Sequence, residues 1–120
     1  MKTLALIAAA LLLAPGVAAA ADLTGAWTIS TNVADMPFTI VCNMTQTGAV
    51  LGGTCGVKDA PDKPSVLTGA ADGDSAKWAY DVTFQDMPLH VDFAGVAKGS
   101  AMSGTISVLD MPSPFTAVKQ

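Results

Sequence analysis

The phrase Asp-Met-Pro recurs along the chain, and its spacing constrains the fold more than any other feature of the sequence. Three copies and one degenerate copy, Asp-Ala-Pro, occupy residues 35–37, 86–88, 110–112 and 59–61. A shift of 51 residues aligns Trp27 with Trp78 and the first phrase with the second, and it gives ten identities in 48 ungapped pairs. Average composition would give roughly three. Self-similarity at a fixed period predicts a duplicated unit, with repeats over residues 22–69 and 73–120.

Residues 1–21 have the features of a secretory signal peptide. A charged start is followed by an apolar run over residues 4–13 and by an alanine tract that ends at residue 21. The apolar run is too short to span a membrane, and the alanine-rich style is typical of bacteria. We therefore expect residues 22–120 to form one exported domain, periplasmic or secreted, without a membrane span or lipid anchor.

The charge pattern disfavours anionic partners. The chain has ten acidic residues, all of them Asp, and six basic residues, all of them Lys, for a formal net charge of −4. Loss of Lys2 with the leader would take this net charge to −5. Nucleic-acid binding relies on basic patches, and bidentate phosphate recognition relies on Arg, which is absent. We expect no nucleic-acid partner.

From residue 23 onward, polar and apolar residues alternate, and Gly, Asp and Pro interrupt the alternation at intervals of roughly 8–12 residues, which is typical of short antiparallel strands. Eight strands are predicted, four in each repeat, over residues 23–31, 38–46, 50–57, 65–71, 76–84, 89–97, 101–108 and 115–119. An up-and-down meander of this kind places the Asp-x-Pro phrases at one end and the Gly-bearing turns at the other. Closure removes exposed strand edges, so the predicted fold is an all-β, eight-stranded antiparallel barrel.

Cys42 and Cys55 fall opposite each other across the turn at residues 48–49, on the inward face of both strands. Directly opposed cross-strand positions lie within reach of a disulfide. Two cysteines in an exported chain of this size indicate a structural bridge, and two thiols alone make a weak metal site. We predict a Cys42–Cys55 disulfide.

The Asp-x-Pro phrases have a structural interpretation that leaves one residue type unexplained. Asp accepts local backbone hydrogen bonds in turns, and Pro is tolerated at the start of a strand. Neither property explains the methionines Met36, Met87 and Met111. These side chains either plug the barrel end or form an adaptable apolar rim over a cavity.

Metal-binding and catalytic alternatives depend on the same phrases and on His90. The three methionines with His90 would suit Cu(I). Ca²⁺ or a cationic ligand could be attracted by a ring of four carboxylates, Asp35, Asp59, Asp86 and Asp110. The repeat explains the recurrence without a metal, and strand parity places His90 on the outer face. Because nucleophile and phosphate-loop motifs are also absent, we predict no metal, no cofactor and no enzymatic activity.

The segment 23–28, Leu-Thr-Gly-Ala-Trp-Thr, resembles the opening of calycin barrels (lipocalins, fatty-acid-binding proteins, avidins and bacterial metalloprotease inhibitors), which begin with Gly-x-Trp. It is most similar to the avidin opening, and Lys119 stands where calycins place a basic residue over that Trp. The phrase at residues 102–105, Met-Ser-Gly-Thr, is similar to lipocalin-like barrels of bacteria. The biotin ligands of avidins have no counterparts in this chain. The resemblance implies a barrel that binds a small ligand at its mouth or a protein through its loops.

These observations predict an exported, non-enzymatic binding protein that holds a small apolar ligand, neutral or cationic, at the barrel mouth. Eight strands enclose a space that side chains just fill or that holds one small ligand, and the predicted interior is tapered. The predicted ligand-binding residues are Trp27, Met36, Trp78, Tyr80, Met87 and Met111. The phenol of Tyr80 would orient a polar end of the ligand. The alternative is a barrel with a filled interior that binds an exported protein or inhibits a protease.

Overall fold

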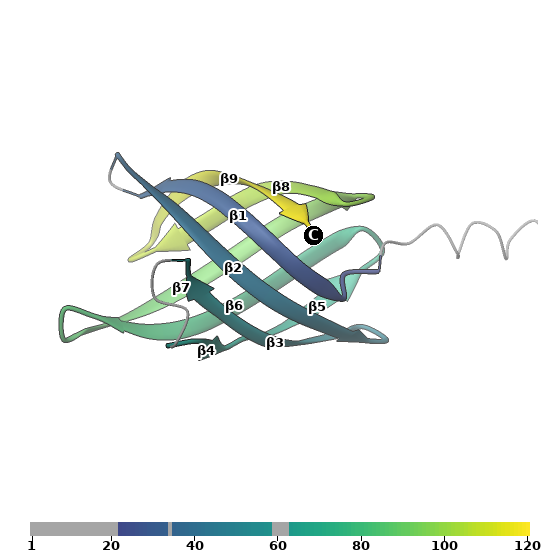
Figure 1. Cartoon of the computed structure of the whole chain (residues 1–120), viewed down its shortest axis with the longest axis horizontal. Helices are drawn as coiled ribbons and strands as arrows, with labels where there is room; N and C mark the ends of the chain where they lie inside the picture. The colour runs from purple at the N-terminus through teal and green to yellow at the C-terminus, as the bar shows by residue number, and fades with distance from the viewer. Residues whose placement is uncertain (1–21, 34, 59–62) are drawn as a thin grey trace, which may run out of the picture.

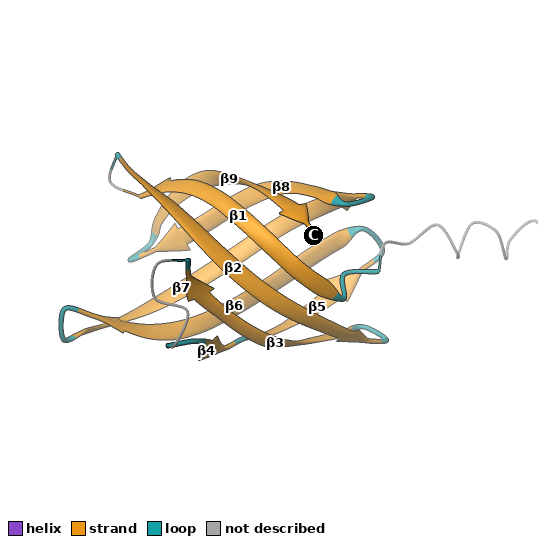
Figure 2. Cartoon of the chain, in the orientation of Figure 1, coloured by secondary structure: helices purple, strands orange, loops and turns teal. Residues whose placement is uncertain are grey.

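The computed structural model describes residues 22–33, 35–58 and 63–120, and these residues form strands and loops without any helix (Figures 1 and 2). The strands are β1 (Gly25–Val33), β2 (Met36–Thr47), β3 (Val50–Val57), β4 (Ser65–Val66), β5 (Thr68–Asp72), β6 (Ser75–Phe84), β7 (Met87–Lys98), β8 (Ala101–Val108) and β9 (Met111–Lys119). The predicted signal peptide and the degenerate phrase at residues 59–61 lie outside the described residues.

All strand pairs are antiparallel, and consecutive strands pair along the chain, except that β4 and β5 both pair with β3 and not with each other. The β1–β9 pairing joins the two ends of the meander and closes the sheet. The short strands β4 and β5 together form one wall strand, which is interrupted at Leu67. The predicted all-β, eight-stranded antiparallel barrel is therefore confirmed, and its strands are inclined to the barrel axis, as closure requires (Figure 1).

Residues that are 51 apart occupy matching register positions in three strands of each half. Trp27 pairs with Cys42 and Trp78 with Phe93, and the β1–β2 and β2–β3 registers recur in β6–β7 and β7–β8. The fourth strands differ, because β9 follows β8 after a two-residue turn whereas residues 58–64 separate β3 from β4. A shared register is what duplication would produce, and the duplication itself stays a prediction.

A close approach of neighbouring strands explains one of the repeated residues. A Cβ atom on Gly53 would overlap the carbonyl oxygen of Asn43, and one on Gly104 would overlap the carbonyl oxygen of Ala94. These two glycines are 51 residues apart, as are the two residues that they face. Glycine is required at both positions because any side chain would push the paired strands apart.

The connections at one end of the barrel are tight glycine turns. Gly48, Gly73 and Gly99 have φ values of 62°, 61° and 63°. Each is the first of two turn residues, the position that type II′ hairpins assign to glycine. The sequence predicted these three turns.

The Asp-Met-Pro turns at the other end are equally short. One of these turns consists of Gln85 and Asp86, and another consists of Leu109 and Asp110. In each turn both residues have a positive φ, as in type I′ hairpins. Asp35 has a φ of 64° at the corresponding position. The short polar side chain of Asp tolerates this left-handed conformation better than most residues. The aspartate of each described phrase is thus explained by the turn alone.

The proline of each described phrase occupies a position that needs no backbone donor. Pro88, the second residue of β7, pairs with Thr83, and the neighbouring pair, Phe84 with Met87, closes the turn. Hydrogen-bonded and non-hydrogen-bonded pairs alternate along an antiparallel ladder, so the nitrogen of Pro88 faces away from β6. On that side, β8 pairs with β7 only from Val91 onward, so the missing N–H leaves no gap in the ladder. Pro37 and Pro112 occupy the equivalent positions in β2 and β9.

Side chains fill the barrel at the glycine-turn end. Strand β1 begins at Gly25 and not at residue 23, where the sequence predicted it to begin. The reason is that Leu23 folds across this end of the barrel, where it is completely buried together with Trp27. The indole Nε1 of Trp27 donates a hydrogen bond to the Leu23 carbonyl (2.9 Å), and the Leu23 amide donates to Oε1 of Gln46 (2.9 Å). Lys119 Nζ lies 5.8 Å from the centroid of the Trp27 ring, the contact that the calycin resemblance implies. Leu23 and Trp27 thus close this end.

An aromatic cluster occupies the middle of the barrel. The ring of Trp78 stacks on that of Phe93, with centroids 4.7 Å apart, and Phe115 meets Trp78 edge-on at 6.0 Å. Tyr80 lies over the same Phe93 ring at 5.9 Å. Offset-stacked and edge-to-face pairs are favourable arrangements of aromatic rings, so this cluster forms a fixed layer across the interior.

Candidate functional site

The barrel is hollow at the end that carries the Asp-Met-Pro turns. A cavity of about 360 Å³ opens there, within the range of roughly 300–1,000 Å³ that is typical of small-molecule sites. Residues of β1, β2, β3, β4, β6, β7 and β8 line it, together with Lys63. Most of the lining is aliphatic or aromatic, as in Phe38, Val82, Leu89 and Val108. The arrangement can enclose an apolar molecule.

The most buried polar side chain in the cavity lining is Tyr80. It is 6% exposed, and burial raises the pKa of its phenol to about 12, so the hydroxyl is neutral at physiological pH. No residue within the described part of the chain forms a hydrogen bond with this hydroxyl. The other polar groups of the lining, Ser65, Thr83 and Lys63, are half-buried or exposed.

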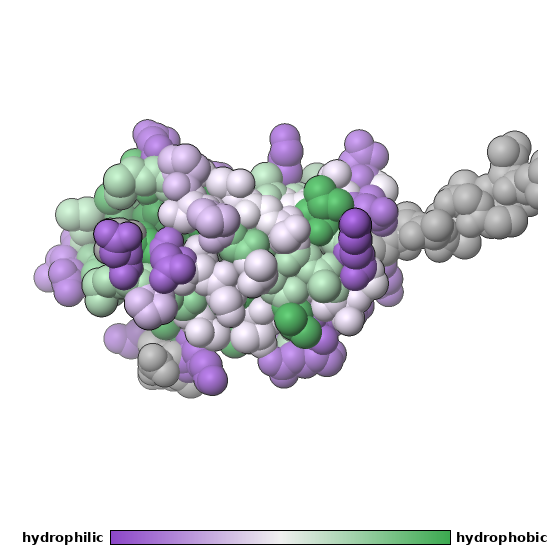
Figure 3. All heavy atoms as spheres, turned by 90° about the horizontal axis from the view of Figure 1, so that it is seen from above, coloured by the Kyte–Doolittle hydropathy of each residue, from purple (hydrophilic) through white to green (hydrophobic). Residues whose placement is uncertain are grey.

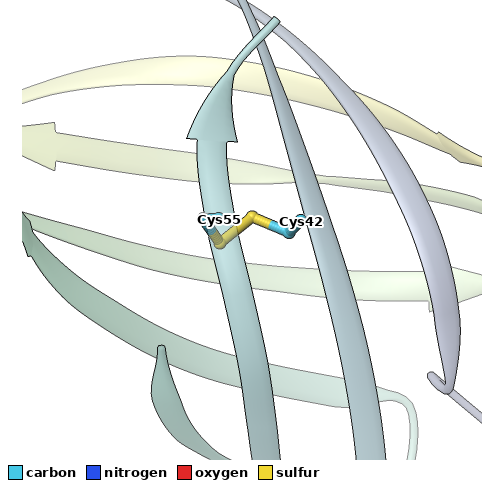
Figure 4. The surroundings of a disulfide bond; sticks show 2 residues. All are labelled: Cys42 and Cys55. Carbon is cyan, nitrogen blue, oxygen red and sulfur yellow. A yellow bond between two sulfur atoms is a disulfide. The ribbon is translucent and has the colours of Figure 1, made fainter. Parts of the chain in front are cut away.

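The Cys42–Cys55 disulfide links β2 and β3 (Figure 4). The two cysteines pair directly, with Cα atoms 4.0 Å apart, and both are almost completely buried. Cys55 lines the cavity. The predicted disulfide is confirmed, and it is consistent with folding in an oxidising compartment.

An exposed apolar rim surrounds the mouth of the cavity. Met36, Met87 and Met111 are the first residues of β2, β7 and β9, and each is more than half exposed, as are Phe84 and Leu109. We call these five residues the apolar rim. Figure 3 shows apolar atoms gathered at the left end of the barrel, where these turns lie. Because their side chains are so exposed and none of them lines the cavity, the methionines do not plug the barrel end.

The predicted ligand-binding residues divide into three groups. Tyr80 lines the cavity, whereas the three methionines belong to the exposed apolar rim and do not line it. Trp27 closes the opposite end, and Trp78 belongs to the aromatic layer beneath the cavity, so neither lines it. Sequence reasoning missed the aliphatic walls, including Val82 and Leu89, although strand parity near the Asp-x-Pro turns could have identified them.

One wall of the cavity is the free end of the β6–β7 hairpin. Strand β5 pairs with β6 only as far as Ala79, and β8 pairs with β7 only from Val91. Residues 81–84 and 87–90 therefore pair only with each other within the described residues. Figure 1 shows this hairpin extending beyond the rest of the barrel. Its inward side chains, among them Val82 and Leu89, line the cavity, whereas its outward side chains face solvent.

His90 lies on the outer face of this hairpin between two aspartates. Its Nδ1 is 2.7 Å from Oδ1 of Asp81, and its Nε2 is 3.1 Å from Oδ1 of Asp92. The side chains of all three residues are more than half exposed, which confirms the outward position predicted from strand parity. Within residues 22–33, 35–58 and 63–120, no group of three or more His, Cys, Asp or Glu side chains is placed to hold a metal ion.

The hydrogen bond to Asp81 and the charge of Asp92 raise the pKa of His90 above its ordinary value. A raised folded-state pKa means that this contribution to stability is fully present below the unfolded-state pKa and is lost as pH rises through the folded-state pKa. We expect His90→Ala to lower the melting temperature slightly at pH 5.5 and not at pH 9. Thermal unfolding at the two pH values measures this loss, and NMR titration of the His90 ring in the wild type measures the raised pKa. An equal loss at both pH values would contradict this assignment.

A second hollow, of about 530 Å³, lies on the outer surface over β5, β6, β7 and β8. Most of the residues that line it are small or polar, among them Thr68, Ala79, Ala94 and Thr105. It is a wide, shallow depression. It therefore cannot surround a small molecule as the cavity at the mouth can.

Comparison of the chain with protein-family models, with curated proteins and with solved structures found no match. Among the described residues, no helix is long and apolar enough to cross a membrane. The functional argument therefore rests on the geometry of the barrel.

Proposed function

We propose that this protein is an exported binding protein that holds a small, mostly apolar molecule in the cavity at the Asp-Met-Pro end. The observation that carries this proposal is the asymmetry of the barrel. Leu23 and Trp27 close one end, whereas the other end opens on an apolar cavity of about 360 Å³. Burial of apolar surface contributes about 25 cal/mol per Å², so an apolar guest gains most from such walls.

Charges around the mouth favour a neutral or cationic ligand. Asp35, Asp86 and Asp110 are exposed in three of the turns that surround the opening. Lys63 lines the cavity on the β4 side and balances part of this charge. Because acidic turns outnumber this cation, the local potential opposes the approach of anions.

The predicted signal peptide and the disulfide both support export to the periplasm or the medium. The Gly-x-Trp opening and the contact between Lys119 and Trp27 support a calycin-type, lipocalin-like barrel. That relationship is part of the proposal, and it agrees with binding rather than catalysis.

The apolar rim favours a second candidate, binding of an exported protein or inhibition of a protease. Exposed methionines adapt to different partner surfaces, and contiguous exposed apolar groups often mark interaction sites. Mixing the domain with secreted metalloproteases tests this candidate. Slowed proteolysis, or a complex that survives gel filtration, would support it over small-molecule binding.

Filling the cavity tests the main proposal. Val82 is half-buried and lines the cavity, so Val82→Trp places an indole in the ligand's space. We expect affinity for the neutral fluorescent probe N-phenyl-1-naphthylamine to fall by about 100-fold, which corresponds to about 2.7 kcal/mol. Val96→Trp on the outer face is the matched control and should bind the probe as the wild type does.

Equal probe binding by the wild type and Val82→Trp would refute a ligand site in this cavity.

A second experiment, native mass spectrometry of the protein isolated from its source, identifies the natural ligand. The expected result is an added mass that Val82→Trp does not retain.

A further inference from the structure

We infer that the ligand carries an uncharged hydrogen-bond acceptor, such as a carbonyl or ether oxygen, that receives a hydrogen bond from the Tyr80 hydroxyl. This inference rests on the proposed function and specifies the class of ligand that the cavity takes.

The position of Tyr80 supplies the first argument. It lies on the inward face of β6 between Trp78 and Val82, it is 6% exposed, and it lines the cavity. Its hydroxyl has no hydrogen-bond partner within the described residues. The oxygen atom itself is not fully buried, so it keeps access to solvent through the cavity. A ligand that fills the cavity displaces this solvent, and a ligand that pairs with the hydroxyl avoids a desolvation cost that a hydrocarbon would leave uncompensated.

The chemistry of the unpaired groups supplies the second argument. Burial raises the pKa of Tyr80 to about 12, so its hydroxyl keeps the proton that it can donate. The Nε1 of Trp78, which is buried without a partner within the described part of the chain, does not line the cavity and is out of a ligand's reach. The unpaired donor that the cavity offers is therefore the Tyr80 hydroxyl, and the ligand group that complements a donor is an acceptor.

The walls around Tyr80 require this acceptor to be uncharged. The cation in the lining, Lys63, is an exposed residue. Val82 and Val91, which lie beside Tyr80 in the lining, are apolar. A carboxylate buried among these groups would lose its hydration without a buried counter-charge. A carbonyl or ether oxygen has a far smaller desolvation cost and accepts the same hydrogen bond.

Three probes of similar size separate these contributions: 4-phenyl-2-butanone carries a neutral acceptor, butylbenzene carries none, and 4-phenylbutyrate carries a charged one. Their affinities are measured by displacement of N-phenyl-1-naphthylamine from the wild type and from Tyr80→Phe. This substitution removes only the hydroxyl and keeps the ring over Phe93.

We expect Tyr80→Phe to weaken binding of the ketone by about tenfold and to change binding of butylbenzene by less than about twofold. The carboxylate should bind more weakly than the ketone to the wild type. Because the hydroxyl has no protein partner, Tyr80→Phe should melt at the wild-type temperature or above it. This result also shows that the variant folds.

Each contrary outcome has a distinct meaning. If Tyr80→Phe binds the ketone as tightly as the wild type does, or melts several degrees lower, the inference about the acceptor is overturned while the cavity remains a ligand site. If the wild type binds neither the fluorescent probe nor any of the three compounds, both the inference and the proposed function are overturned.

Discussion

Replacement of Trp27 by alanine is expected to lower the free energy of unfolding by about 3–5 kcal/mol, the range observed when a large aromatic side chain is deleted from a core. Trp27 is completely buried, and together with Leu23 it closes the glycine-turn end of the barrel. Small domains are stable by only about 5–15 kcal/mol, so this single change removes a large share of the total. Urea unfolding followed by circular dichroism measures the loss.

The two tryptophans provide a matched comparison, because they occupy equivalent register positions in β1 and β6. Trp27→Phe removes the hydrogen bond from Nε1 to the Leu23 carbonyl and leaves a buried acceptor unpaired, at a cost of about 1–3 kcal/mol. Trp78→Phe removes an Nε1 that has no partner within the described residues. Trp27→Phe should therefore be the more destabilising of the two. Equal losses would contradict the role of Leu23 in closing the barrel end.

Local signals in the sequence determined most of the fold correctly. The two-residue turn at residues 48–49 fixes the register of the hairpin, and this register places Cys42 opposite Cys55. Alternation within a strand assigns side chains to faces, which was sufficient to place His90 outside and Tyr80 inside. Each of these inferences needs only the residues of one hairpin, so one sequence contained enough information.

The depth of a residue along the barrel axis could not be obtained in this way. Trp78 and Phe84 share the inward face of β6, yet Trp78 is buried in the aromatic layer and Phe84 is more than half exposed. Depth depends on the stagger of all strands around the closed sheet, which no single hairpin encodes. For this reason both tryptophans were predicted to contact the ligand although neither lines the cavity.

The fourth wall strand shows a second limit. Residues 65–71 were predicted as one strand, but the structure divides them at Leu67, whose amide donates a hydrogen bond to the Gly53 carbonyl (3.0 Å). The pattern of small residues in this segment gives no clear alternation, and the connection before it is longer than the turn between β8 and β9. Weak alternation specifies register poorly, so neighbouring strands decide the local geometry.

Removal of the disulfide by the double substitution Cys42→Ala and Cys55→Ala is expected to destabilise the barrel by up to about 3 kcal/mol. The cysteines are 13 residues apart in sequence, so the bridge closes a short loop. The β2–β3 hairpin already holds these residues together in the folded state, and any hairpin that persists in the unfolded chain reduces the loss further. Denaturant unfolding of the variant and of oxidised wild type measures the difference.

Chemically reduced wild type separates the cross-link from packing. It lacks the bond but keeps both sulfur atoms in the core, whereas the double alanine variant also leaves space beside the cavity, because Cys55 lines it. We therefore expect the reduced wild type to lie between the other two forms in stability and to bind the apolar probe more tightly than the alanine variant. If reduction alone costs as much as the double substitution, the sulfur atoms contribute nothing to packing. In that case the disulfide acts only as a cross-link, and its sulfur atoms do not shape the wall of the cavity.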